Sequence, residues 1–303
     1  MEKDFHYFLI YAIASTTGFE DADIIAFASQ FVDDNNEGQF SIDGQKAFFP
    51  KKIPFNGGHY FPIMTQSLSP KSLDTYVQKY VYVPFHFIPG DQSQPIDGRV
   101  NAFATTPGSP VATQILKNAL ASNNPYQIGI ALHSYADTWS HQNFTGFQET
   151  WNSVYPWYNV FKSIVPNIGH AEAGHSPDVI SETWTDHRLK QKIVNTDRAF
   201  KATGQIYQAL RRKSGNGPLW SAVSSAFKAI IRAHDYDARI AAISAYLPNA
   251  IPNYNKNAWI DAALDREGEK IVMRDNFEQT HWYRFHQAAK THFAQVMELT
   301  KTL

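Results

Sequence analysis

The 303-residue sequence predicts a mostly helical, all-α protein. Apolar residues recur near the 3.6-residue helical spacing in several long segments, and alternating runs typical of strands are few and short. No repeat, low-complexity tract or linker divides the chain, and its 43% hydrophobic content is enough for a sizeable core. We therefore expect a single multi-helix domain over residues 1–303, with functional motifs in 4–180 and a helical packing region in 181–303.

The expected helices begin at typical start signals. Glu20 and Asp21 suit the positive start of a helix dipole, Ser109 precedes Pro110, and Pro125 occupies a plausible first position. In chain order the predicted helices are 4–17, 20–32, 69–83, 109–122, 124–142, 197–212, 218–233 and a last one carrying Trp282, Phe285, Ala289, Phe293 and Val296. The stretches 35–70, 84–98 and 142–180 contain Gly and Pro and are predicted to be irregular.

Composition excludes several function classes. The formal net charge of −1 argues against a broad polyanion-binding surface, so we expect no stable nucleic-acid partner. The absence of cysteine excludes disulfides, thiolate metal sites and a cysteine nucleophile. No apolar run approaches the ~20 residues of a membrane span. Glu2 and Asp4 are the wrong flank for a signal peptide, so a cytoplasmic location is expected.

The stretch "LHSYADTWSH", residues 132–141, contains three side chains that commonly bind metal ions. His133, Asp137 and His141 are four residues apart, so on a helix they form a slowly drifting stripe. His133 and Asp137 can reach one ion, Asp137 can bridge two ions with its two oxygens, and His141 would serve a neighbouring ion. The alternative is structural, because a buried histidine paired with an aspartate also occurs without metal.

Further candidates lie on both sides of this stretch. They are His6 in the first helix, the Asp33–Asp34 pair, His86 in "PFHFIPGD", and His170, His175 and Asp178 in "IGHAEAGHSPD". Small residues around His170 and His175 would let the backbone approach an ion. Taken singly, His6 could be a surface residue, the aspartate pair a helix-end cap, and His86 a loop anchor.

The order of these residues resembles that of the zinc-dependent phospholipase C superfamily, which is all-helical and includes single-strand-specific nucleases. The segments "DFHYFLIYAIASTTGF…ASQFVDDN" and "GHAEAGHSPD" look like an uncharacterised bacterial branch of that group, over about residues 4–180. The H-x-x-x-D motif alone is weakly specific, whereas the ordered set is moderately specific.

The resemblance implies two or three divalent ions, with zinc expected. His86, His133 and Asp137 would hold one ion, His6 a second bridged by Asp137, and His141 would help to bind a third. One aspartate of the pair would lie near the attacking water. The proposed ligands are His6, Asp34, His86, His133, Asp137, His141, His170, His175 and Asp178, and the candidate catalytic acids are Asp33 and Asp34.

The sequence departs from the family at two places. Met1 stands where the family has a metal-binding tryptophan, with Asp4 as a candidate replacement. The family's last motif is H-x-x-x-E or H-x-x-x-D, but Gly174 lies four residues after His170, and Asp178 three after His175.

The expected function is metal-dependent hydrolysis of phosphoesters, on a phospholipid or another small phosphodiester, by water that the ions acidify. An aromatic group after the metal helix, from Phe144, Phe147, Trp151, Tyr155, Trp157, Tyr158 and Phe161, could line the substrate site or simply pack in the core. Two alternatives stay open. The ions could be structural in a binding protein, or His234–Asp235 could be the doublet of an HD-type phosphohydrolase.

Overall fold

The computed structural model describes residues 1–36, 53–55, 58–60, 62–90, 94–155, 166–267 and 270–303. Most of the described residues are helical and only a few belong to strands, so the prediction of a mostly helical protein is confirmed. Within the described residues, no helix combines the length and the apolar character needed to cross a bilayer.

The N-terminal half contains the helices that surround the metal-ligand candidates. They are η1 (Asp4–Leu9), which is π-helical, α1 (Ile10–Thr16), α2 (Ala22–Asp34), η3 (Pro70–Leu73), α3 (Thr75–Val77), η4 (Gln78–Tyr82), α4 (Val83–Phe85), α5 (Pro110–Ser122), α6 (Pro125–Ser140), η5 (Thr150–Asn152) and η6 (Ala171–Ala173). The predicted helix 69–83 is divided into four short pieces, and the last of them continues through Pro84 to Phe85.

The C-terminal half consists of longer helices and two hairpins. Its helices are α7 (Asn195–Ser214), α8 (Trp220–Ile231), α9 (Tyr236–Tyr246), α10 (Ala258–Ala263), η7 (Phe277–Gln279) and α11 (His281–Leu299). The strands among the described residues form three antiparallel pairs: β1 (Ile53–Phe55) with β2 (Gly58–Tyr60), β3 (Thr183–Asp186) with β4 (Gln191–Val194), and β5 (Leu264–Glu267) with β6 (Lys270–Met273).

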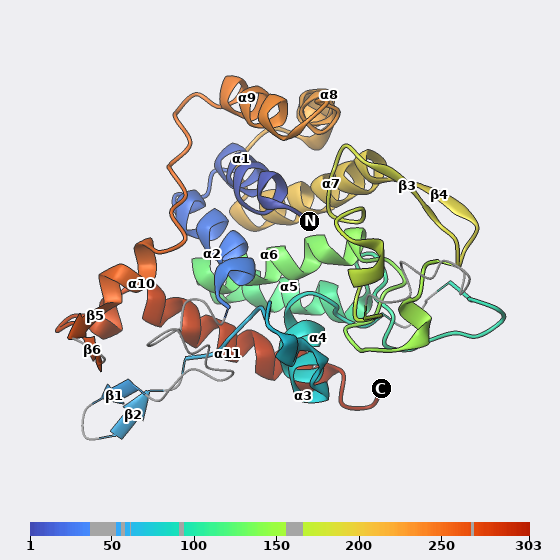
Figure 1. Cartoon of the computed structure of the whole chain (residues 1–303). Coiled ribbons are helices and arrows are strands. Elements are labelled where there is room, and N and C mark those ends of the chain that lie inside the picture. Colours follow the sequence, from blue (N-terminus) through green and yellow to red (C-terminus); the bar gives the residue numbers. More distant parts are fainter. Residues whose placement is uncertain (37–52, 56–57, 61, 91–93, 156–165, 268–269) are drawn as a thin grey trace.

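Helix α6 is the centre of the structure. It contacts α2, α5, α7 and α11, which surround it in Figure 1. Asn124 caps its start by accepting hydrogen bonds from the backbone amides of Tyr126 and Gln127, and Pro125 occupies the first turn. Because neighbours cover it on most sides, nearly all of its side chains are buried, including His133 and Asp137.

The close contact between α2 and α6 depends on Gly129. A Cβ atom at this position would lie 2.4 Å from the Ile25 carbonyl oxygen and 2.7 Å from the Ala28 Cβ. Only glycine therefore permits this separation of the two helices. The packing brings the end of α2, with Asp33, next to His133 on α6.

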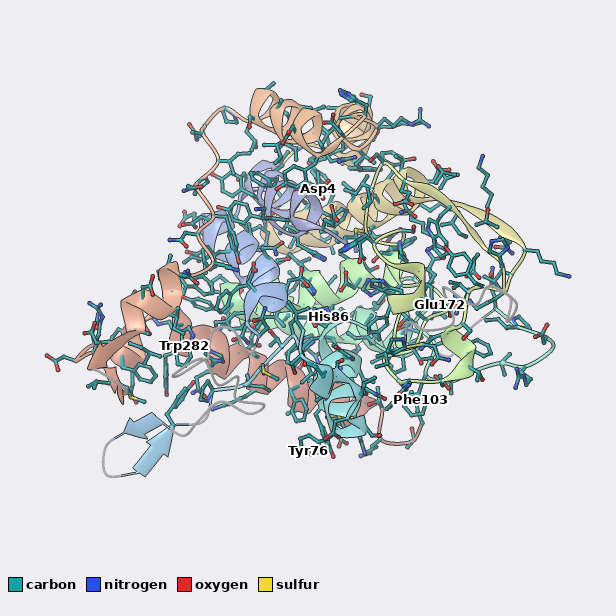
Figure 2. The ribbon with its side chains drawn as sticks, viewed as in Figure 1. Asp4, Tyr76, His86, Phe103, Glu172 and Trp282 are labelled. Carbon is teal, nitrogen blue, oxygen red and sulfur yellow. The ribbon has the colours of Figure 1, made fainter. Side chains whose placement is uncertain are left out.

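The hydrophobic core extends from Met1 and Phe5 at the N-terminus to Val296 in α11. Phe31, Phe85 and Phe285 are among its fully buried side chains. His86 is labelled near the centre of the molecule in Figure 2, where the segment after α4 passes beside α6. The functional candidates are thus held by helices that belong to one large, packed core.

Candidate metal centre

Asp137 lies at the centre of the candidate site, with 1% of its surface exposed. Its Oδ1 is 2.7 Å from the Met1 amino nitrogen and 3.1 Å from His6 Nε2. Its Oδ2 is 3.3 Å from His86 Nδ1, 3.2 Å from His133 Nε2 and 3.8 Å from His141 Nδ1. Both oxygens of one carboxylate therefore face nitrogen atoms, three from distant parts of the sequence and two from residues four positions away.

We call His6, His86, His133 and Asp137, with Asp33, the inner cluster. Two sets of potential ligand atoms in it, His6–His133–Asp137 and Asp33–His86–His133, each lie within 4.8 Å of one another. The His6 and His133 rings stack with centroids 3.9 Å apart, and neither ring is exposed. Asp33 Oδ1 lies 3.8 Å from His86 Nδ1 and 3.7 Å from His133 Nε2.

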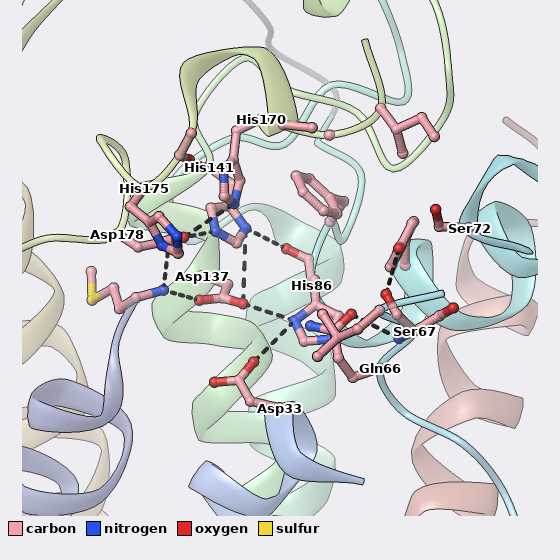
Figure 3. Close-up of a pocket in the computed structure, with 18 of the residues that line it drawn as sticks. Asp33, Gln66, Ser67, Ser72, His86, Asp137, His141, His170, His175 and Asp178 are labelled. Carbon is pink, nitrogen blue, oxygen red and sulfur yellow. Dashed lines mark hydrogen bonds and ion pairs between the residues drawn. The ribbon is translucent and has the colours of Figure 1, made fainter. Parts of the chain in front are cut away.

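We call His141, His170 and Asp178 the outer cluster. Asp178 Oδ1 lies 2.9 Å from His141 Nε2 and its Oδ2 lies 3.2 Å from His170 Nε2. The Met1 amino nitrogen is 3.0 Å from Asp178 Oδ1, so this amino group stands between the two clusters. Figure 3 shows Asp178 beside His141 and His170, and Asp137 between His141 and His86. The outer cluster is more open than the inner histidines and Asp137, since the side chains of His170 and Asp178 are 19% and 15% exposed.

Three histidines share an arrangement that fixes which ring nitrogen bears the proton. His86 Nε2 lies 2.9 Å from the Thr65 carbonyl, His141 Nδ1 lies 2.9 Å from the His86 carbonyl, and His170 Nδ1 lies 3.0 Å from the Gly174 carbonyl. A carbonyl only accepts, so these nitrogens must donate. In a neutral ring the other nitrogen then carries a lone pair, and in all three residues it faces a carboxylate.

Burial and neighbouring charges shift the pKa values of the two central carboxylates and of the Met1 amine. Burial would raise the pKa of Asp137, but the Met1 ammonium, His141, His133 and His6 together hold it well below its ordinary value. The pKa of Asp178 is likewise held well below its ordinary value, by His170, the Met1 ammonium and His141, against burial. Burial would lower the pKa of the Met1 amine, but the carboxylates of Asp137, Asp178 and Asp33 raise it to about 11.

The histidines and Asp33 shift in different directions. Burial lowers the pKa of His6 well below its ordinary value, with a further contribution from His133. Burial also lowers the pKa of His170, and Asp178 only partly offsets this. His141 is buried too, but Asp137 and Asp178 outweigh burial and raise its pKa. Burial raises the pKa of Asp33 although His133 and His86 oppose it.

A cavity of about 530 Å³ opens over the two clusters. Its polar floor includes Asp33, His86, Asp137, His141, His170 and Asp178, whereas Tyr82, Phe87 and Ile168 form apolar walls. His6 and His133 lie beneath this floor. No lysine or arginine is among the described residues that line the cavity.

Two predicted site residues lie outside both clusters. Asp34 accepts hydrogen bonds from the Tyr254 hydroxyl at 2.7 Å and from Gln30 Nε2 at 3.2 Å. Adjacent side chains on a helix point in different directions, so Asp33 faces the cavity and Asp34 faces away. His175 is 88% exposed at the cavity rim, and its nearest acidic partner is Glu2, 3.9 Å away.

Other predicted residues also have different surroundings from those expected. Asp4, the candidate replacement for the family's tryptophan, pairs with Arg239 instead. His234 and Asp235 are 83% and 56% exposed, and Asp235 caps α9 by accepting from the Ala238 amide. Neither residue of this doublet belongs to a potential metal cluster among the described residues.

Part of the aromatic group packs inside the protein. Phe144 is fully buried and Trp151 is 7% exposed. Trp157, Tyr158 and Phe161 lie outside the described residues. Phe87, by contrast, lines the cavity and stacks on His141 with ring centroids 4.7 Å apart, although the sequence pattern did not single it out.

Sequence reasoning treated Met1 only as a departure from the family and did not place its amine between the clusters, and it missed the Thr65 carbonyl, because backbone and terminal groups leave no residue-type pattern. Nothing among curated proteins or solved structures matches the chain. One family model, described as a family of unknown function (DUF6765), matches residues 1–300. Since this match covers almost the whole length, the chain belongs to that family of unknown function.

Proposed function

We propose that this protein is a metal-dependent phosphoester hydrolase that binds two or three divalent ions, with zinc as the expected metal. The observation that carries the proposal is the convergence of Asp137 with the lone-pair nitrogens of buried histidines beneath an open cavity. The order of these residues, which resembles the zinc-dependent phospholipase C superfamily, supports the same proposal.

The arrangement of these nitrogen and oxygen atoms is more favourable with divalent ions between them than without. In neutral His86 and His170, the backbone carbonyl contacts direct a lone pair at a carboxylate, which is an unfavourable contact unless a cation lies between them. In metal-binding histidines, the N–H of the second ring nitrogen commonly donates a hydrogen bond to a backbone carbonyl in this way. Imidazole and carboxylate are suitable ligands for zinc.

The proposed assignment divides the ligands between the two clusters. His6, His86, His133 and Asp137 would hold the inner ions, with Asp137 shared between them. His141, His170 and Asp178 would hold a further ion. Divalent ions bound there would lower the pKa of a water molecule and neutralise phosphate oxygens.

The residues of the chain supply the remaining functions. Asp33 faces the cavity with 29% of its side chain exposed, and burial raises its pKa toward the range useful for a general base. It would accept a proton from the attacking water. No lysine or arginine is found among the described residues lining the cavity, and the Met1 ammonium there already pairs with Asp137 and Asp178. The negative charge of a phosphodiester would therefore be balanced by the ions.

A structural role for the ions is the second candidate. Structural sites are closed by protein ligands, whereas catalytic sites keep a coordination position open. Five ligand candidates of the two clusters and Asp33 line the cavity, and the outer cluster is partly exposed. This openness favours catalysis. The HD-type alternative receives no comparable support, because its doublet lies exposed and apart from both clusters.

The test combines metal analysis with turnover. We expect purified protein to contain divalent metal and to hydrolyse a chromogenic phosphodiester, with activity lost on chelation and restored by zinc. For variants of the buried histidine ligands, the matched control is His286→Asn. It changes a buried histidine outside both clusters but keeps an acceptor for the Ile63 amide. Metal without turnover on phosphodiester, phosphomonoester, phospholipid or single-stranded nucleic acid would favour the structural role, and absence of metal binding would refute both.

A further inference from the structure

The N-terminal segment that carries Met1 and His6 is held on its other side by a contact with the C-terminal half of the chain. Asp4 Oδ2 accepts a hydrogen bond from Arg239 Nη1 at 2.7 Å, and these two residues are 2% and 1% exposed. Arg239 belongs to α9, which packs on η1. Asp4 is labelled on the N-terminal helix in Figure 2, on the side toward α8 and α9.

Arg239 is itself held in a fixed orientation. Its Nη1 also donates to the Asp235 carbonyl and its Nη2 donates to the Ala233 carbonyl, both at 3.2 Å. The planar guanidinium thus joins the turn before α9 to η1. A lysine keeps the charge but cannot reproduce these fixed contacts together.

Asp4 and His6 are two residues apart in η1 and have different partners. Asp4 contacts Arg239, whereas His6 contacts Asp137 at 3.1 Å. A rotation or shift of η1 would therefore change both contacts at once. Tyr7 adds a second contact on the same helix, because its hydroxyl donates to the Pro252 carbonyl at 2.7 Å.

We propose that Arg239, acting through Asp4, is a positioning residue that sets where the His6 ring lies in the inner cluster. Stability alone does not account for the pair, because a buried ion pair can often be replaced by apolar residues at no cost in stability. Its geometry gives it another use, since it fixes the orientation of a ligand-bearing helix. Only the metal readout of this inference rests on the proposed function.

The first test is a double-mutant cycle on zinc affinity, using Arg239→Met and His6→Gln. Outer-shell substitutions at metal sites typically weaken binding by about 10- to 100-fold, and we expect Arg239→Met to weaken the inner site within that range. In the His6→Gln background, the same substitution should have little further effect. Equal losses in both backgrounds would overturn the proposal, because Arg239 would then act without His6.

The second test needs no metal. Histidine ring NMR spectra of the chelated protein, assigned with His6→Gln, should show shifted His6 and His133 signals in Arg239→Met and an unchanged His170 signal. Unchanged His6 signals would refute the positioning role even if the wild type binds no zinc, whereas absence of zinc binding by the wild type would refute the proposed function alone.

Two further variants keep the tests decisive. If Arg239→Met fails to fold, the neutral pair Asp4→Asn with Arg239→Gln removes the buried charges together and should show the same displaced His6 signal. Arg239→Lys, which keeps the positive charge, should bind zinc more tightly than Arg239→Met but less tightly than the wild type. Arg274→Met is the matched control, because Arg274 pairs with Asp265 at 2.8 Å on the surface, and it should change neither readout.

Discussion

The inner and outer clusters have similar ligands but are built on different kinds of structure. The inner histidines and Asp137 come from helices or from the residue directly after one, and their exposed fractions range from 0% to 4%. In the outer cluster, His170 and Asp178 come from the irregular segment around η6, which is closer to solvent. A helix that is packed on several sides holds its side chains more rigidly than a loop does. We therefore expect the inner ions to be bound tightly and the outer ion to exchange.

The largest expected effect comes from Asp137→Asn, which would remove the feature that joins the two clusters. An asparagine has one acceptor oxygen and cannot bridge ions, so metal should be lost from the inner cluster. Phosphodiesterase activity should fall by more than about 100-fold, above the range for outer-shell changes. Elemental analysis and turnover measure the two effects. Full metal content in this variant would contradict the bridging role.

His170→Ala should separate the clusters. It removes one ligand of the outer ion and leaves every inner ligand in place, so the variant should bind about one ion fewer per chain. Stepwise chelation of the wild type should likewise release one ion first. His133→Gln is the comparison variant, and it should instead lower the content of inner ions. Simultaneous loss of all ions in His170→Ala would show that the clusters form a single cooperative site.

His292→Gln tests burial without ligation. His292 is buried in α11 and its Nε2 lies 2.8 Å from the Pro84 carbonyl. Burial, with a small contribution from His133, lowers its pKa from 6.5 to about 4 although the Pro84 contact opposes this. The unfolded chain then binds a proton below pH 6.5 that the folded chain refuses until about pH 4, so stability falls as the pH falls through this window.

We expect chelated His292→Gln to keep about 3 kcal/mol more of its pH 7 stability at pH 4 than the wild type does. Urea unfolding of both proteins at the two pH values measures this difference. Metal content at pH 7 should be unchanged, because the His292 ring hydrogen-bonds with Pro84 and Ser134 and not with a ligand of either cluster. If the stability of the two proteins changed with pH in parallel, folding would not lower the pKa of His292, and the prediction would be wrong.

The smallest expected effect concerns Gly174 in the outer segment. Its φ of +63° with ψ of −136° is a conformation that residues with a Cβ rarely adopt, although the space around it is open. Gly174→Ala should cost about 1 kcal/mol, and so should weaken the outer ion by about fivefold. Gly215→Ala at the end of α7 also places a Cβ at a positive φ, +69°, but should leave metal affinity unchanged. Equal zinc binding by the two variants would contradict a loop-dependent outer site.

The sequence predicted the helical class and the main ligand stripe because both depend on local spacing. His133, Asp137 and His141 recur every four residues, and the helical repeat places them on one side of α6 whatever surrounds it. The same repeat located most of the longer helices. The helical repeat predicted one helix over 69–83, where the structure has the four short pieces η3, α3, η4 and α4. Local spacing does not predict these breaks.

Only the tertiary structure decided which neighbouring candidates enter the clusters. Asp33 and Asp34 have the same chemistry, and the choice between them depends on the packing of α2 on α6 at Gly129 and on the Tyr254 hydroxyl that holds Asp34. His170 and His175 differ in the same way, because the backbone around Gly174 turns one ring inward and leaves the other in solvent. The Met1 amine lies between Asp137 and Asp178, and Arg239, from the C-terminal half of the chain, pairs with Asp4 on the helix that carries His6. Residue spacing fixes the direction of a side chain within its own helix, but the meeting of segments more than a hundred residues apart depends on how the whole core packs.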